Sequence, residues 1–567
     1  MHRIRRGGPA SGAGRTVPTQ RVLVAVVAGA ITLLVVVPLL RLVQVVVDES
    51  AGRLGEILTA DGMADAVRST LLLAVAVTVF SVPLGTAMAL VLRRPDLPGR
   101  SLWLGAVLLP VIVPEFVLAY SWTQAYARAG FTDTLFGVRW TGVLGPQGVV
   151  AVLVANAVPL CYLLTAVGLA ARAEPSLERA ARACGATSAT VLRTITLPLL
   201  GPAMAASAIL VFVLSLGTFA IPRVLGSPAG FETVTTRIYA NLSLGGDPFS
   251  FVQAIALALL LVVLAALVVV PADSLLTPRL RATRVAGSEG APVVPGRRTA
   301  SRWLVAGLGA YLLVTVGLPL VALGSAAITR AVGLPPNPSN WTLDNFREVL
   351  STRTFEALGR SLVLSAVAAT LLVVLGGAVA VLERRRAGRA VPTLVTLTLV
   401  LPGSTLAVAL LITYGRLLAG TLTLILLAYL SKLWAFAHRP ISVALERLPP
   451  EEMHAARVCG AAPLTAVRTV ALRPLAPAVL GAWLICFLTA LHEVTMSSLL
   501  YGAGTETLAV VVLNSAELGR IGPTAALSVL LSALMAVPAL LFWLVLRRLA
   551  APRPRARDVI PPGRARA

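Results

Sequence analysis

Charged residues are scarce in this 567-residue chain, which has 13% Asp, Glu, Lys and Arg against 57% hydrophobic residues. A water-soluble protein of this length needs far more charge on its surface, so a soluble globular fold is excluded. Lysine occurs once, as Lys432, and no glycine-rich loop precedes it. A Walker A loop needs a lysine to reach the nucleotide phosphates, so the chain is not by itself an ATPase of that type.

Cysteine and histidine are also sparse, with four residues of each. Their spacing fits neither a metal site nor a disulfide framework, and no nucleophile-elbow pattern lies in a soluble domain. We therefore expect no enzyme activity, no resident metal ion and no bound cofactor in this chain. The residues concerned are Cys161, Cys184, Cys459, Cys486, His2, His438, His454 and His492.

Long apolar runs dominate the sequence, and a membrane-crossing helix needs about 20 such residues. None of the runs shows the alternating pattern of barrel strands. The sequence therefore predicts an all-α membrane protein with about twelve transmembrane helices. The predicted spans are 21–42, 67–92, 101–125, 148–171, 201–222, 250–272, 303–326, 359–383, 391–415, 420–440, 478–500 and 522–546.

The net charge of +23 reflects membrane topology rather than nucleic-acid binding. Most of the 48 basic residues fall in alternate loops, while the intervening loops carry acidic residues such as Asp48, Glu49 and Asp61. The positive-inside rule places the basic loops, and with them both termini, in the cytoplasm. The first apolar run exceeds the length of a signal-peptide core, so we expect it to stay as a helix. We therefore expect the chain to be surrounded by membrane lipid and not to bind nucleic acid.

Two halves of six spans each are separated by a basic linker, and we interpret them as parallel repeats of a transporter. Each half begins its second span alike, with Arg68-Ser69-Thr70-Leu71 in one and Arg360-Ser361-Leu362 in the other. The predicted domains are a cytoplasmic N-terminus at 1–20, a first half at 21–272 with its core at 66–272, a cytoplasmic linker at 273–302, a second half at 303–547 with its core at 358–547, and a cytoplasmic tail at 548–567.

One polar loop occurs in both halves, 275 positions apart. It reads Ala180-Ala181-Arg182-Ala183-Cys184-Gly185-Ala186 and then Ala455-Ala456-Arg457-Val458-Cys459-Gly460-Ala461. A helix that starts at Pro175-Ser176, a break at Gly185 and a second short helix ending near Pro198 are expected. Such a loop is either an amphipathic helix lying on the membrane or a knob that docks in a partner protein. Its recurrence at one offset favours docking.

The two loops resemble the E-A-A-x-x-x-G-(x)9-I-x-L-P pattern of permease subunits of binding-protein-dependent ABC importers. The chain looks like a fused permease of the ferric-iron transport type, most clearly over 60–275 and 350–550. Further similarity lies in Leu109-Pro110 through Pro114, Phe219-Ala220-Ile221-Pro222, Thr233 through Tyr239 and Glu506 through Val510. The resemblance implies the type I permease fold in a bacterial plasma membrane. It also implies two copies of an ATPase subunit, which use the ATP, and an external substrate-binding protein.

The resemblance assigns coupling to the ATPases to residues of the two loops. The motif's glutamate is replaced by Arg179 in one loop and His454 in the other. Either the neighbouring Glu178 and Glu452 supply the missing carboxylate, or they lie on a solvated face and docking depends on shape. The expected coupling residues are Glu178, Ala180, Ala181, Gly185, Pro198, Glu452, Ala455, Ala456 and Gly460.

Ionisable groups inside membrane spans are costly and often functional. Glu493, beside His492, falls in the eleventh predicted span, and Glu115 follows Pro114 in the third. The repeat offset pairs Glu493 with Thr218. These residues are candidates for a pathway or gate, with structural hydrogen bonding as the alternative. We do not expect Glu493 to ligate iron, since this class leaves recognition to the external binding protein.

Other functions fit parts of the sequence. A major-facilitator-type secondary transporter also has twelve spans and a basic central linker, but has no need of the repeated loop. A membrane scaffold fails to explain the loop as well. Within the importer class, thiamine, aminophosphonates, polyamines and sulfate are alternatives to ferric iron, and composition does not decide among them.

Overall fold

The computed structural model describes residues 18–50, 56, 61–93, 97–172, 175–243, 245–282, 302–384, 391–448, 450–462, 465 and 467–550. Nearly all of this described part is helical, and one isolated β-bridge joins Thr329 to Trp341. The predicted N-terminal segment 1–20, linker 273–302 and tail 548–567 fall largely outside it. The predicted domain boundaries stay predictions.

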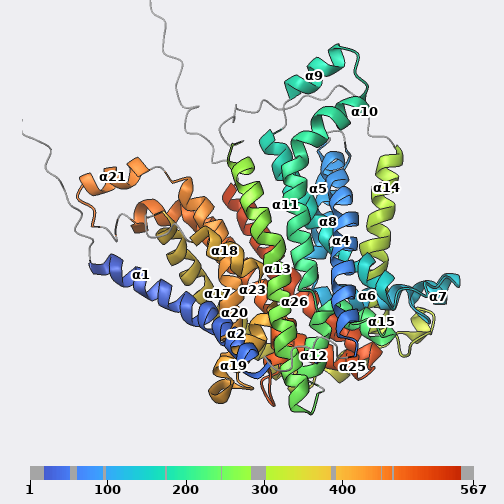
Figure 1. Cartoon of the computed structure of the whole chain (residues 1–567). Coiled ribbons are helices and arrows are strands. Elements are labelled where there is room, and N and C mark those ends of the chain that lie inside the picture. The colour runs from blue at the N-terminus through green and yellow to red at the C-terminus, as the bar shows by residue number, and fades with distance from the viewer. Residues whose placement is uncertain are drawn as a thin grey trace, which may run out of the picture.

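The two halves contain similar series of long helices, and Figure 1 shows how these helices are arranged. The first half contains α1 Pro18–Ile31, α2 Val37–Ser50, α4 Met63–Leu92, α5 Arg100–Ile112, α6 Glu115–Tyr126, α7 Phe131–Phe136, α8 Pro146–Arg172, α9 Pro175–Ala183, α10 Ser188–Val191, α11 Leu197–Leu216, α12 Val234–Ser243 and α13 Pro248–Ala282. The second half contains α14 Arg302–Leu312, α15 Leu318–Ile328, α16 Asp344–Val349, α17 Thr352–Glu383, α18 Val391–Val400, α19 Gly403–Leu418, α20 Leu422–Glu446, α21 Pro450–Val458, α23 Leu472–Leu491, α24 Thr495–Leu500, α25 Leu508–Glu517 and α26 Ile521–Ala550.

Nine spans among the described residues are long and apolar enough to cross a membrane, and two bent helix pairs raise the number to as many as eleven. The predicted all-α membrane architecture is therefore confirmed. The remaining predicted span, 420–440, corresponds to the 25-residue helix α20, which is not among these candidates. The count of twelve and the orientation in the membrane stay predictions.

Two of the predicted spans, 101–125 and 391–415, are not continuous helices. The pair α5 and α6 is bent by 105°, and the pair α18 and α19 by 99°. Each break ends at a proline, Pro114 or Pro402, which has extended backbone and precedes the second helix. Proline has no backbone N–H and disfavours helical geometry in the residue before it, so the helix stops there.

The first span of each half packs against the other half, and a π-helical turn makes this contact. The turn Thr32–Val36, between α1 and α2, accepts hydrogen bonds from Tyr414 Oη to Leu33 O (2.7 Å) and from Ser431 Oγ to Leu34 O (2.8 Å). Such widened turns free carbonyl groups from the helix's own ladder.

The equivalent turn Leu313–Gly317, between α14 and α15, accepts bonds from the first half. Trp122 Nε1 donates to Thr315 O (3.2 Å) and Tyr126 Oη to Val314 O (2.5 Å). Each half therefore holds the other half's first span, and the two halves interlock.

The outward faces of the spans are apolar. Large hydrophobic side chains are exposed along several of the described spans, which is the arrangement expected of helices in contact with lipid. Examples are Leu102, Val167, Leu267, Trp303, Val374 and Leu544. The two repeated loops, with α9 and α10 in one and α21 in the other, lie toward the upper end in Figure 1, and α12 and α25 lie at the lower end.

Candidate functional site

The two repeated loops have the same backbone geometry. After α9, Ala186 N donates to Ala181 O (3.0 Å), and after α21, Ala461 N donates to Ala456 O (3.0 Å). These bonds close the helix end around a glycine in the left-handed region, as expected of a Schellman-type cap. Gly185 has φ of +86° and Gly460 of +85°, and a Cβ at either would meet open space. Both glycines therefore serve the turn, while their outer faces are open to a partner.

The predicted second short helix does not end near Pro198. Helix α10 continues through a π-helical turn, Leu192–Thr196, into α11, so that one 29-residue span runs from Ser188 to Leu216. The second loop repeats this arrangement with the turn Val467–Ala471 before α23. Pro198 follows this π-helical turn closely, at a point where the regular hydrogen-bond ladder of the helix is already interrupted. The loop is thus continuous with the helix that leads to the interior.

Glu178 is engaged within the chain. Its Oε1 accepts from Thr196 Oγ1 (3.2 Å) and lies 3.9 Å from Arg93 Nη1. Among the other predicted coupling residues, Glu452 is exposed. The side chain of His454, which replaces the motif's glutamate, lies outside the described part. Ala180 and Ala455 are exposed, whereas Ala181 and Ala456 are half-buried. Small side chains therefore form much of the described outer face of each loop.

A cavity of about 200 Å³ lies between the two halves, at the breaks in the bent helices. It brings together all four predicted pathway residues, which come from distant parts of the sequence. Backbone and apolar side chains of both halves complete its wall. Its side chains that can carry charge or form hydrogen bonds include Glu115, Asn156, Ser215, Thr218, Lys432, His492, Glu493 and Thr495.

Glu493 lies in the break between α23 and α24, and not inside a continuous eleventh span. Its carboxylate accepts from Met496 N (2.8 Å) and Ser497 N (3.1 Å), the first free donors of α24. Ser497 Oγ also bonds to Tyr429 Oη (2.7 Å). Glu493 therefore acts as a helix cap, which is the structural hydrogen bonding considered above, while it also lines the cavity.

Glu115 lies at the start of α6, directly after the break at Pro114. Asn156 Nδ2 donates to its Oε1 over 3.4 Å, a long bond. Thr218 lies beside it in the cavity wall, and its Oγ1 is buried without a hydrogen-bond partner in the described part of the chain. Compared with Glu493, Glu115 is held by one long hydrogen bond in the described part of the chain.

His492 Nδ1 lies 2.6 Å from Leu488 O. Because a carbonyl oxygen can only accept a hydrogen bond, we assign the proton to Nδ1, which donates. Within the ranges that the structure describes, no three His, Cys, Asp or Glu side chains are grouped so that they could hold a metal ion. The cavity thus offers charge and hydrogen bonds without a ready set of metal ligands.

A salt bridge joins the halves toward the end opposite the repeated loops. Arg223 Nη2 lies 2.8 Å from Glu517 Oε1, and the guanidinium sits 4.9 Å from the ring centroid of Tyr239. Arg223 and Tyr239 belong to the first half, and Glu517 ends α25 of the second. This half-buried ion pair is positioned to keep the halves together at that end.

Helices α12 and α25 are attached to the rest of each half in one common way. Thr70 Oγ1 accepts from Val234 N (2.9 Å) at the start of α12, and Ser361 Oγ accepts from Leu508 N (2.7 Å) at the start of α25. Each hydroxyl satisfies a buried N–H that the short helix leaves free. The similar starts of the second spans in the sequence therefore have a structural role.

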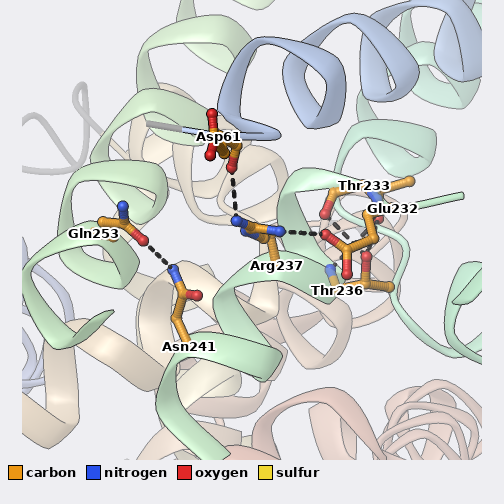
Figure 2. Close-up of polar contacts among 7 residues, drawn as sticks. All are labelled: Asp61, Glu232, Thr233, Thr236, Arg237, Asn241 and Gln253. Carbon is orange, nitrogen blue, oxygen red and sulfur yellow. Dashed lines mark hydrogen bonds and ion pairs between the residues drawn. The ribbon is translucent and has the colours of Figure 1, made fainter. Parts of the chain in front are cut away.

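The ion pairs around these helices differ. Figure 2 shows Arg237 of α12 between Glu232, at 2.8 Å, and the backbone oxygen of Asp61, also at 2.8 Å. Asn241 Nδ2 further donates to Gln253 Oε1 (3.2 Å). Near α25, Glu506 pairs instead with Arg353, from the start of α17.

The sequence interpretation missed Lys432 and Asn156 as cavity residues, and Arg223 as a link between the halves. A signal for the first two was present, because a lysine and an asparagine inside apolar runs are unusual. No pattern pointed to Arg223, since its partner is 294 residues away.

Comparison with known proteins adds an independent line of evidence. Residues 81–281 and 350–556 each match the family described as "binding-protein-dependent transport system inner membrane component". The ferric transport system permease protein FbpB of Actinobacillus pleuropneumoniae is 24% identical over 497 residues, covering 84% of this chain and 71% of that protein. The Fe(3+)-transport system permease protein FbpB 2 of Haemophilus influenzae is 25% identical, over 81% and 85%. The molybdenum transport system permease protein ModB of Haemophilus influenzae is 33% identical, over 30% of this chain and 75% of its own length.

Proposed function

The chain belongs to the family of inner membrane components of binding-protein-dependent transport systems, the permeases of ABC importers, and from that premise we propose that its cargo is ferric iron. As a member of this family it is a multi-pass protein of a bacterial plasma membrane that works with ATPase and substrate-binding protein partners. Its role is transport and not enzymatic catalysis. Because both halves match this family, the major-facilitator and scaffold alternatives are left without support.

The observation that carries the iron proposal is the extent of the matches. Both ferric permeases are similar over more than four fifths of the chain, and therefore over both halves. The carboxylates of Glu115 and Glu493 in the cavity support it further, because they favour a cation over an oxyanion.

Molybdate is the second candidate, since the molybdenum permease has the higher identity over its shorter match. An oxyanion would meet two carboxylates and one ammonium group in the cavity. Thiamine, aminophosphonates and polyamines stay alternatives within the importer class, and no relative named above supports them.

For the mechanism we propose alternating access. The external protein delivers its ligand at the end of the halves where Arg223 and Glu517 meet, and two ATPase subunits dock on the loops at Gly185 and Gly460. Because each loop is continuous with α11 or α23, a movement of the loop reaches the cavity wall through a rigid helix. ATP is used by the ATPase subunits, and this chain contributes the path.

The test is uptake of labelled ferric iron by cells that lack this chain, with and without the restored wild-type protein, in a strain without a second iron importer. Iron uptake that depends on the chain would support the proposal. Unchanged iron uptake with lost molybdate uptake would replace iron by molybdate as the cargo.

A further inference from the structure

The single lysine of the chain lies in the cavity between the halves. The other 47 residues of the Lys and Arg class are arginine, and within the described part of the chain no arginine lines the cavity. Lys432 sits on α20, near the centre of the helix. A lysine differs from an arginine in being a compact charge on a flexible stem, without the planar fork that fixes a carboxylate in place. Lys432 is therefore better suited than any arginine of the chain to exchange between two carboxylate partners.

The ammonium group of Lys432 shares the cavity with carboxylates from both halves. A methyl group at Gly403 would lie 3.2 Å from Lys432 Nζ and 3.8 Å from Glu493 Oε1, so both charged groups lie beside the Gly403 backbone. Glu115, from the first half, lines the same cavity. Lys432 thus shares the cavity with two acidic side chains that belong to different halves.

The repeat shows that this arrangement is specific to one side of the cavity. Gly85 would meet Cys161 and Tyr162 if it carried a Cβ, and Gly376 would meet Ala437 and His438. This shared packing aligns α8 with α20, and in that alignment Asn156 is the residue equivalent to Lys432. The first half therefore contributes a neutral amide where the second contributes a cation.

We propose that Lys432 is a built-in counter-ion: its single positive charge offsets part of the negative charge of Glu115 and Glu493 between transport events, and a cationic cargo passes by taking its place at these carboxylates. The inference rests on the proposed function in one respect, that the cargo is a cation. Carboxylates buried without a counter-charge are strongly unfavourable, so the lysine would stabilise the resting cavity and also help to expel the cargo.

The stability test uses the purified full chain in lipid nanodiscs. Lys432→Met should lower the melting temperature by roughly 5 °C, because it leaves the two carboxylates of the cavity without a nearby lysine charge. Adding Glu115→Gln should restore most of that loss, and Lys432→Arg should keep the charge and most of the stability. Arg416→Met, which removes an exposed cation from the end of α19, serves as the matched control and should change nothing. Equal melting temperatures for Lys432→Met and the wild type would overturn the inference.

The transport test uses the complete complex with its ATPase and binding protein in proteoliposomes, and labelled ferric iron as the probe. Lys432→Met should retain several times more iron on the washed complex than the wild type, with at least tenfold slower uptake. Glu115→Gln/Lys432→Met should lose the excess retention. A purely structural lysine would lower the amount of active complex without raising retention, and that result would also overturn the inference.

The two proposals fail in different ways. If the wild-type complex neither takes up nor retains iron, while the melting temperatures still show coupling between Lys432 and Glu115, the iron proposal is wrong and the counter-ion stands. If the wild type transports iron but the variants show neither coupling nor retention, the counter-ion is wrong and the iron proposal stands.

Discussion

The two halves of the chain share the same backbone arrangement but place different charged residues at the cavity. Both have a capped loop with a left-handed glycine, a span broken before proline, and a short helix held by a hydroxyl. At the cavity they differ. Glu115 follows the break in the first half, whereas Gly403 follows it in the second, and Thr218 of the first half corresponds to Glu493 of the second.

This contrast separates two kinds of constraint. The repeated loops, which we propose as docking sites for ATPase subunits, and the features that hold the scaffold are duplicated, because two equivalent folds require them twice. Features of the path are distributed unequally, because a single cargo passes a single cavity. Each half carries one of the acidic residues, at positions that are not equivalent, and the second half alone carries the lysine.

The largest effect should come from disrupting the duplicated loops. Gly185→Glu and Gly460→Glu should each abolish uptake while leaving the chain in the membrane. The left-handed backbone strains any other residue by about 1–2 kcal/mol, and the added carboxylate would block the open face. Transport assays and membrane fractionation measure the two effects. Gly185→Ala, which adds the strain without the bulk, should lose only part of the activity, and normal uptake in either glutamate variant would contradict the coupling role.

A smaller effect is expected from the asymmetric link between the halves. Arg223→Glu should reduce uptake several-fold and lower the melting temperature by a few degrees, because it places two acidic groups side by side. Combining it with Glu517→Arg should recover a large part of both losses. If the double variant is no better than the single one, the ion pair is not what holds this end together.

The hydroxyl caps offer a direct test of scaffold symmetry. Thr70→Ala and Ser361→Ala should each destabilise the chain by about 1–3 kcal/mol, since each leaves a buried N–H without a partner. Thermal unfolding in nanodiscs measures the losses, and Thr70→Ser is the matched control. Markedly unequal losses in the two halves would show that the common geometry does not mean a common energetic role.

The smallest effect should follow from Gly403→Ala, which makes the second half slightly more like the first. The new methyl would lie 3.2 Å from Lys432 Nζ, and the flexible end of the lysine can shift by the few tenths of an ångström required. We expect a modest decrease in iron uptake rate with an unchanged melting temperature. A loss as large as that of Lys432→Met would mean that the backbone at Gly403, and not the charge, controls the path.

Much of this architecture could be predicted from the sequence, because periodic features leave local signals. Apolar runs marked the spans, and the recurrence of Ala180 to Ala186 marked the loops. The breaks before Glu115 and Gly403 were harder, since proline is tolerated inside other spans here, such as at Pro83 and Pro159.

What could not be predicted depends on contacts between distant segments. Side chains of each half donate hydrogen bonds to the first span of the other half. The acceptors are carbonyl groups of the π-helical turns, such as those of Leu33 and Val314. The cavity likewise combines Glu115 with Glu493, which are 378 positions apart. Hydrophobic patterning specifies that a helix is buried, but not which helix covers it.

Two cysteines of this chain provide natural labelling sites for measuring the movement of the repeated loops. Cys184 and Cys459 occupy equivalent, exposed positions one residue before Gly185 and Gly460, whereas Cys161 and Cys486 are buried. A thiol-reactive spin label or fluorophore should therefore react at these two places first and place one reporter on each loop of the unaltered protein. The distance between the reporters, followed with and without ATP, would show how far the loops approach each other in every step of the cycle.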